Sequence, residues 1–150
     1  MKKIIYLSGD HAGFNDKGKL KEWLKKKKYE VKDFGPRKYN KNDDYPEFVS
    51  LMVKAMKRKS NSVGIVIAGS GMGEAIAANK FRGIRAAVYH GKNLKIVKTT
   101  REHNDSNILC MGSRFVKLNE MKKATELFLR TKFKGGRHLR RLKEIEKLTK

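Results

Sequence analysis

A glycine-rich stretch that ends in a glutamate is the first feature that suggests chemistry. Residues 68–80 read AGSGMGEAIAANK, so Gly69, Gly71 and Gly73 come just before Glu74. N–H groups at a helix N-terminus bind anions well, but a carboxylate in the first turn would repel a pyrophosphate. The spacing G-x-G-x-G also differs from the dinucleotide pattern, and no Walker lysine–serine pair is present. A nucleotide site is therefore disfavoured.

Two interpretations of Glu74 remain open on these residues alone. The glutamate could do no more than interact with the helix dipole, which is worth about 0.3–1 kcal/mol. Alternatively, a carboxylate that is ionised near neutral pH can remove a proton from a carbon next to a carbonyl. The enediolate that forms needs preorganised donors, such as the N–H groups of residues 70–73. This second reaction requires neither a metal nor a redox cofactor.

Other polar residues lie next to apolar runs in a similar way. GDHAG (9–13) offers Asp10 and His11 side by side, REHNDSN (101–107) is expected to be a loop before the last apolar run, and GSR (112–114) follows that run. Ligands of open parallel sheets bind beyond the carboxyl ends of the strands. The chain has only 15 acids, and four of them fall at the inspected connections: Asp10, Asp44, Glu74 and Asp105.

The apolar runs alternate with segments of helical periodicity. Five runs are typical of strands: 3–8, 29–34, 63–68, 84–89 and 107–112. Helical segments between strands favour right-handed crossovers and a parallel sheet covered on both faces. We therefore predict one α/β domain over residues 1–150, a Rossmann-like doubly wound fold with a five-stranded parallel sheet. The segment 35–45 is the longest irregular stretch.

Apolar residues define the expected helix faces. One face holds Leu20, Trp23 and Leu24; a second, with Pro46 in its first turn, holds Phe48, Leu51, Met52, Ala55 and Met56; a third holds Met121, Ala124, Thr125 and Phe128. A last helix from 137 to about 148 carries four apolar residues on one side: Leu139, Leu142, Ile145 and Leu148. Because the crossovers are complete without it, we expect this helix to pack on a second copy of the chain.

Composition narrows the class of protein. The chain has 37 Lys and Arg against 15 Asp and Glu, a net charge of +22, but the cations are spread along it without a known nucleic-acid signature. We expect solvated faces and a field that attracts phosphorylated metabolites, and nucleic acid is an unlikely partner. Apolar runs such as IVIA (65–68) are too short for a membrane span, and the apolar stretch within MKKIIYLSGD (1–10) is too short for a signal peptide, which predicts a cytoplasmic protein. A single cysteine, Cys110, allows no intramolecular disulfide and no metal cluster; we expect it in the core.

Seven motifs, in order, resemble the type B ribose-5-phosphate isomerases and their relatives that act on galactose 6-phosphate and allose 6-phosphate. They are GDHAGF (9–14), DYP (44–46), GSGMGEAIAANK (69–80), GIRAA (83–87), EHNDSN (102–107), GSR (112–114) and GGRH (135–138) with Arg141 beyond. The resemblance implies reversible conversion of ribose 5-phosphate and ribulose 5-phosphate through an enediolate, without a cofactor or metal. An isomerase of a hexose 6-phosphate is the alternative.

The resemblance also assigns roles to residues. Many members use a cysteine base just before the glycine loop; here that position is Ala68, and the mycobacterial kind places a glutamate at the position of Glu74. His103 is implied to open the sugar ring, aided by Asp10. The enediolate would be held by Ser70, Gly71 and Gly73, and a sugar hydroxyl by Asn104, with Gly69 also binding the substrate and Tyr45 lining the site.

The phosphate group is implied to bind four side chains: His11, Arg114, Arg137 and Arg141. Arg137 and Arg141 are one helical turn apart and therefore share a face. In the family, part of this set and the EHND segment reach the active site of a neighbouring subunit. The resemblance thus implies a homodimer or tetramer with shared active sites. Residues 88–100 diverge from the family pattern.

Overall fold

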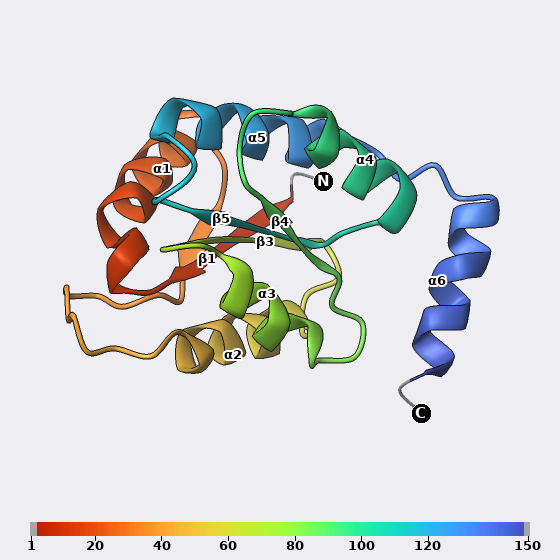
Figure 1. The fold of residues 1–150 in the computed structure, drawn as a ribbon, viewed down its shortest axis with the longest axis horizontal. Helices are drawn as coiled ribbons and strands as arrows, with labels where there is room; N and C mark the ends of the chain where they lie inside the picture. The colour runs from red at the N-terminus through yellow and green to blue at the C-terminus, as the bar shows by residue number, and fades with distance from the viewer. Residues whose placement is uncertain (1–2, 149–150) are drawn as a thin grey trace.

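The computed structural model describes residues 3–148, which form a five-stranded parallel sheet in the order β2-β1-β3-β5-β4 (Figure 1). The strands are β1 (Ile4–Gly9), β2 (Val31–Asp33), β3 (Ser62–Ala68), β4 (Ala86–Tyr89) and β5 (Ile108–Gly112). Register is continuous across the centre: Ile5 pairs with Val63, and Ile65 with Leu109. The predicted Rossmann-like α/β fold is confirmed, although the two outer strands, β2 and β4, are shorter than expected.

Helices cover both faces of the sheet (Figure 1). They are α1 (Phe14–Lys26), α2 (Tyr45–Met56), α3 (Met72–Asn79), α4 (Lys95–Asn104) and α5 (Leu118–Arg130), with a 3₁₀ helix η1 (His11–Gly13) before α1. A further helix, α6 (Arg137–Lys147), follows α5. Buried side chains of α1, α4 and α5 form one core with the sheet. Buried side chains of α2 and α3 form the other core. Alternate residues of β3 point to the two cores, as the pleat requires.

The predicted helix faces are largely correct. Met121, Ala124, Thr125 and Phe128 are all buried, and so are Leu20 and Leu24. On α2 the prediction was partly wrong. Met52 and Met56 are buried together with Val49 and Val53, whereas Leu51 is 48% exposed. The buried stripe is shifted by one residue because the valines, and not Leu51, face the sheet.

The last helix, α6, differs from the helices that cover the sheet in its position and in the exposure of its apolar residues. α6 lies beyond the end of the sheet at which β5 begins (Figure 1), and only Leu142 among its apolar residues is buried. Leu139, Ile145 and Leu148 are 44%, 55% and 81% exposed. α6 is therefore amphipathic with most of its apolar side uncovered. No helix within residues 3–148 has the length and hydropathy needed to cross a bilayer.

Candidate active site

The carboxyl ends of three strands bring their following loops into contact. The Ser113 N–H donates to the Ala68 carbonyl at 2.8 Å, and the Arg114 N–H donates to the Gly69 carbonyl at 3.2 Å. These bonds fasten the loop after β5 to the loop after β3. A Cβ atom on Gly13 would lie 2.0 Å from the Ile67 carbonyl oxygen, so η1 lies directly against the end of β3 as well. This edge is therefore fixed by backbone contacts before any side chain is considered.

The glycine loop turns β3 directly into α3. Gly71 is the N-cap of α3 with φ 79°, a left-handed conformation that side chains other than glycine rarely adopt. A Cβ on Gly71 would also lie 3.0 Å from the Met111 main-chain nitrogen. The turn places Glu74 in the first turn of α3, as the sequence predicted. The Ser70 hydroxyl oxygen accepts the Met72 N–H at 3.2 Å, which occupies one of the loop's main-chain donors.

Glu74 is only 3% exposed. Its pKa is raised above the ordinary value, first because burial disfavours the charged form and then because Asp10 is nearby; a hydrogen bond from the glutamate's own N–H opposes both. A side chain that served only the helix dipole would instead favour its ionised form. Burial outweighs the dipole here. The carboxylate thus has a raised proton affinity, as a general base working near neutral pH requires.

Asp10 and His11 follow β1 at the same edge. Asp10 is 7% exposed and caps η1, because its carboxylate accepts the Ala12 N–H at 2.9 Å. The His11 Nδ1 lies 2.7 Å from Asp43 Oδ1, and the His11 N–H donates to the same oxygen at 3.0 Å. Sequence reasoning did not select Asp43. The contact joins residues 32 positions apart, and the only local signal was a pair of acids in a lysine-rich stretch.

Two further predicted residues border the glycine loop. A Cβ on Gly73 would lie 2.3 Å from the Tyr45 hydroxyl oxygen, so Tyr45 is packed against the loop. A Cβ on Gly69 would lie 3.1 Å from Arg114 Cζ, which places the guanidinium on the other side. The structure therefore gathers nine of the predicted site residues at the carboxyl edge: Asp10, His11, Tyr45, Gly69, Ser70, Gly71, Gly73, Glu74 and Arg114.

The other four predicted residues belong to α4 and α6; the end of α4 and the whole of α6 lie at the opposite edge of the same sheet (Figure 1). His103 and Asn104 form the end of α4, which leads into the first residue of β5. The expectation of a loop over 101–107 was wrong for residues 101–104, which are helical. Since all strands are parallel, the start of β5 is one strand length, roughly 16 Å, from its carboxyl end. Arg137 and Arg141 lie on α6 at this second edge. One chain does not bring the two groups together.

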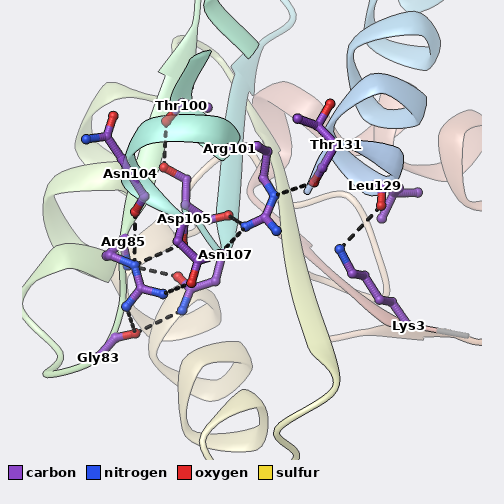
Figure 2. Close-up of polar contacts among 11 residues, drawn as sticks. Lys3, Gly83, Arg85, Thr100, Arg101, Asn104, Asp105, Asn107, Leu129 and Thr131 are labelled. Atoms are coloured by element: carbon purple, nitrogen blue, oxygen red, sulfur yellow. Dashed lines mark hydrogen bonds and ion pairs between the residues drawn. The ribbon is translucent and has the colours of Figure 1, made fainter. Parts of the chain in front are cut away.

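A polar network anchors the end of α4 (Figure 2). Asp105 adopts a left-handed conformation, φ 45°, and accepts Arg101 Nη1 and Arg85 Nη2, each at 2.9 Å. Arg85 Nε also donates to the Asn104 carbonyl at 3.1 Å. Asp105, which the sequence places at one of the inspected connections, therefore ends α4 and pairs with two arginines. The network fixes where His103 and Asn104 stand.

His103 stacks on a second histidine that sequence reasoning passed over. The ring centroids of His103 and His138 are 4.3 Å apart, with an interplanar angle of 9°. The pKa of His138 is lowered, by partial burial first and then by the neighbouring cations. The signal lay within the GGRH motif, where only the arginine was selected. A cavity of about 500 Å³ opens between α6 and residues 79–87, with Asn104 on its wall.

Cys110 was expected in the core, and this is confirmed. It lies in β5 with no exposed surface, and burial raises the pKa of its thiol. Ala68, at the position where many family members are implied to have a cysteine base, is fully buried at the end of β3. No thiolate is therefore available to replace Glu74 at this edge among the described residues.

Residues 5–145 match the protein-family model described as Ribose/Galactose Isomerase. The chain belongs to this family. A probable ribose-5-phosphate isomerase B of Mycoplasma genitalium is 40% identical over 142 residues, which cover 94% of this chain and 92% of that protein. Ribose-5-phosphate isomerase B of Escherichia coli K12 is 38% identical over 145 residues, covering 97% and 95%. The resemblance stated from the seven motifs is confirmed.

Solved structures of family members have the same fold. Ribose-5-phosphate isomerase B from Mycoplasma genitalium with bound ribulose-5-phosphate superposes with a TM-score of 0.92 at 39% identity, covering 99% of this chain and 97% of that one. The ribose-5-phosphate isomerase B of Clostridium thermocellum superposes with a TM-score of 0.91 at 42% identity, covering 97% and 96%. The likeness thus extends over the whole described fold, α6 included.

Proposed function

We propose that the protein interconverts ribose 5-phosphate and ribulose 5-phosphate, with Glu74 as the base. The observation that carries the proposal is a carboxylate 3% exposed at the start of α3, with a raised pKa. It follows the glycine loop that turns β3 into α3 at the same edge of the sheet. Relatives named as ribose-5-phosphate isomerase B, and the structure of one with bound ribulose-5-phosphate, support the choice of sugar. The role would lie in the pentose phosphate pathway, in the cytoplasm, as a single domain.

The proposed reaction begins with ring opening. His103 transfers protons so that the hydroxyl on carbon 1 loses its hydrogen and the ring oxygen gains one, with Asp10 assisting. Glu74 then removes the proton on carbon 2, and the electron pair moves to the oxygen on carbon 1. Main-chain N–H groups of the Ser70–Gly73 loop stabilise that oxygen, since amides fixed in place cost no reorganisation. The proton of the hydroxyl on carbon 2 then passes to the oxygen on carbon 1, and protonated Glu74 returns its proton to carbon 1. Carbon 2 thereby becomes the carbonyl and carbon 1 bears the hydroxyl.

The position of His103 leads to a second part of the proposal. A catalytic centre with both Glu74 and His103 needs two chains, because the two residues lie at opposite edges of one sheet. We propose a homodimer in which each site combines the carboxyl edge of one protomer with His103 and Asn104 of the other. The uncovered apolar side of α6 supports this, since packing on a second copy would bury Leu139 and Ile145.

The phosphate group would bind to cations from both protomers. His11 and Arg114 lie at the carboxyl edge, and Arg137 and Arg141 would come from α6 of the partner. Arginine suits this task because its guanidinium is always charged and donates in a fixed fork. Both α6 arginines are exposed and therefore accessible to such a ligand. The overall net charge of +22 would also favour anionic substrates.

The experiment is an assay of ketose formation from ribose 5-phosphate in chelator-treated buffer. Galactose 6-phosphate and allose 6-phosphate are run beside it, because the family name includes galactose. We expect kcat/KM to be highest for ribose 5-phosphate. A preference for either hexose phosphate would replace the pentose with the alternative substrate. Absence of turnover with all three sugars would contradict the proposed function.

A further inference from the structure

The contact between Asp43 and His11 connects the irregular segment 34–44 to η1. One carboxylate oxygen, Asp43 Oδ1, faces two donors of the same residue: the His11 Nδ1 at 2.7 Å and the His11 main-chain N–H at 3.0 Å. The Asp43 side chain is only 6% exposed, whereas the His11 side chain is 29% exposed. The buried Asp43 carboxylate thus holds the ring of His11, which is itself partly exposed to solvent. The ring can neither swing away nor flip without breaking the shorter bond.

The chemistry of the pair decides what His11 can offer a ligand. An ionised carboxylate only accepts hydrogen bonds, so the proton lies on Nδ1 and Nε2 remains for another partner. Within residues 3–148 the structure gives Nε2 no hydrogen-bond partner. A phosphate oxygen can accept a hydrogen bond from Nε2 when that nitrogen carries a proton. The Asp43 carboxylate holds the other ring nitrogen and thereby fixes the direction in which Nε2 points.

We propose that Asp43 is a positioning residue for the phosphate group of the substrate, acting through the orientation and charge of His11. The inference deepens the proposed function and rests on it, because that function places His11 in the phosphate set. Histidines that ligate metals are commonly oriented by a carboxylate on their second ring nitrogen, and Asp43 contacts His11 in the same manner. Tyr39, from the same irregular segment, meets the His11 ring edge-on, with centroids 6.3 Å apart. The segment therefore holds the ring by a carboxylate and an aromatic contact.

The alternative is that Asp43 acts on the substrate directly. Its second oxygen, Oδ2, is buried and has no hydrogen-bond partner in the described part of the chain. A sugar hydroxyl could donate to that oxygen, in which case Asp43 would matter even without His11. The two mechanisms differ in one measurable respect. If Asp43 works through His11, its removal has no effect once His11 is gone.

The test compares the unsubstituted protein with Asp43→Ala, Asp43→Asn, His11→Ala and the His11→Ala/Asp43→Ala double variant. KM and kcat are measured with ribose 5-phosphate, and the Kd of inorganic phosphate is measured by calorimetry. We expect Asp43→Ala to raise KM and the phosphate Kd together, by roughly 10–100-fold, as the loss of an orienting carboxylate weakens metal binding at metal-ligating histidines. We expect kcat to stay within about 3-fold, because substrate binding and not the proton transfer is weakened.

Asp43→Asn should fall between the unsubstituted protein and Asp43→Ala, because the amide oxygen still accepts from His11 but carries no charge. The matched control is Glu47→Gln, which removes a charge from an exposed acid four residues along the chain. It should change neither KM nor the phosphate Kd. Circular dichroism and Tm check that each variant is folded. If Asp43→Ala does not fold, Asp43→Asn decides the question by the same comparison.

An unchanged phosphate Kd in a folded Asp43 variant would overturn the inference. So would a further loss when Asp43→Ala is added to His11→Ala, because positioning through His11 predicts that the two effects are not additive. Failure of the proposed function has a different signature. In that case the unsubstituted protein turns over no sugar phosphate, while calorimetry still reports whether Asp43 governs phosphate binding at His11.

Discussion

The two ends of the sheet hold the two halves of the proposed site, and they are built in opposite ways. At the carboxyl edge Glu74 and Asp10 are 3% and 7% exposed, and main-chain bonds join the loops after β3 and β5. At the other edge, Arg137 and Arg141 are exposed on a helix that buries a single leucine. The first half is preorganised by the fold of one chain. The second half presents cations and an apolar helix side that a partner would have to cover.

This difference separates the chemistry from the capture of the ligand. A base must be shielded from water to have a raised proton affinity, and burial in a protein core achieves this. Residues that capture an anion need access to solvent and to the incoming charge. We infer that the buried acids of the carboxyl edge contribute mainly to kcat and the exposed arginines of α6 mainly to KM. There are exceptions on both sides: His11 and Arg114 lie at the carboxyl edge but are proposed to bind the phosphate, and His103 lies at the α6 edge but is proposed to open the ring.

The largest loss of activity is expected from a substitution at the carboxyl edge. Glu74→Gln removes the base and should lower kcat by at least about 10²-fold, the usual contribution of general-base catalysis, with the KM for ribose 5-phosphate nearly unchanged. Steady-state ketose formation gives both constants. Glu47→Gln is a matched control, since Glu47 is also in the first turn of a helix but is exposed. Full activity in Glu74→Gln would remove Glu74 from the role of base.

The next prediction concerns the division of the site between two chains. Glu74→Gln and His103→Asn chains, each nearly inactive alone, are co-expressed with different tags. Random pairing makes half of the dimers mixed, and each mixed dimer has one intact site of two, so about a quarter of native activity should return. The control is a mixture of Glu74→Gln and Asp10→Asn, whose substitutions lie in the same half and leave no intact site. Equal activity in the two mixtures would mean that the sites are not shared.

A smaller effect is expected at the exposed end. Arg137→Ala should raise the KM for ribose 5-phosphate by roughly 10–100-fold, because a hydrogen bond to a charged group contributes about 1.5–3 kcal/mol. The kcat should change little. Lys143→Ala is the matched control, since it removes a charge from another side of the same exposed helix. If both variants raise KM equally, the general field of α6, and not a specific contact, attracts the phosphate.

The sequence predicted the buried half better than the exposed half. The glycine loop, Glu74 and the five strands of the α/β fold depend on local patterns, namely a glycine where φ is positive and apolar runs of strand length. The end of α4 was predicted as a loop because Arg101 and Glu102 are polar, and polarity does not distinguish a loop from a helix whose solvated side is charged. Leu51 was predicted to be buried because its spacing fits a helix face as well as that of the valines.

Contacts between segments that are distant along the chain could not be predicted from the sequence. The Asp43–His11 bond depends on the path of the irregular segment 34–44, which no periodicity defines. The His103–His138 stack depends on where α6 docks after α5. The opposite positions of His103 and Glu74 were accessible in principle. In a parallel sheet a segment that precedes a strand lies at the other edge from one that follows a strand, and the EHND segment precedes β5.

The smallest expected effect is a change in thermal stability, which should differ between substitutions in the two halves of the site. In the folded chain the Glu74 pKa is raised, so between the unfolded value, near 4.5, and the folded value the native state binds more protons than the unfolded state. The free energy of unfolding then falls as pH rises from the unfolded to the folded pKa of Glu74. Above the folded pKa, the ionised carboxylate destabilises the fold by an amount that no longer changes with pH. Glu74→Gln should therefore raise Tm at neutral pH, by roughly 2–4 °C for each kcal/mol relieved, and the gain should disappear at pH below about 4.5. His103→Asn, at the solvent-accessible half, should leave Tm nearly unchanged at both pH values. Calorimetric scans of each variant and of the unsubstituted protein at the two pH values measure these Tm changes. If Glu74→Gln has a lower Tm than the unsubstituted protein at neutral pH, the carboxylate stabilises the fold and is not held there for catalysis.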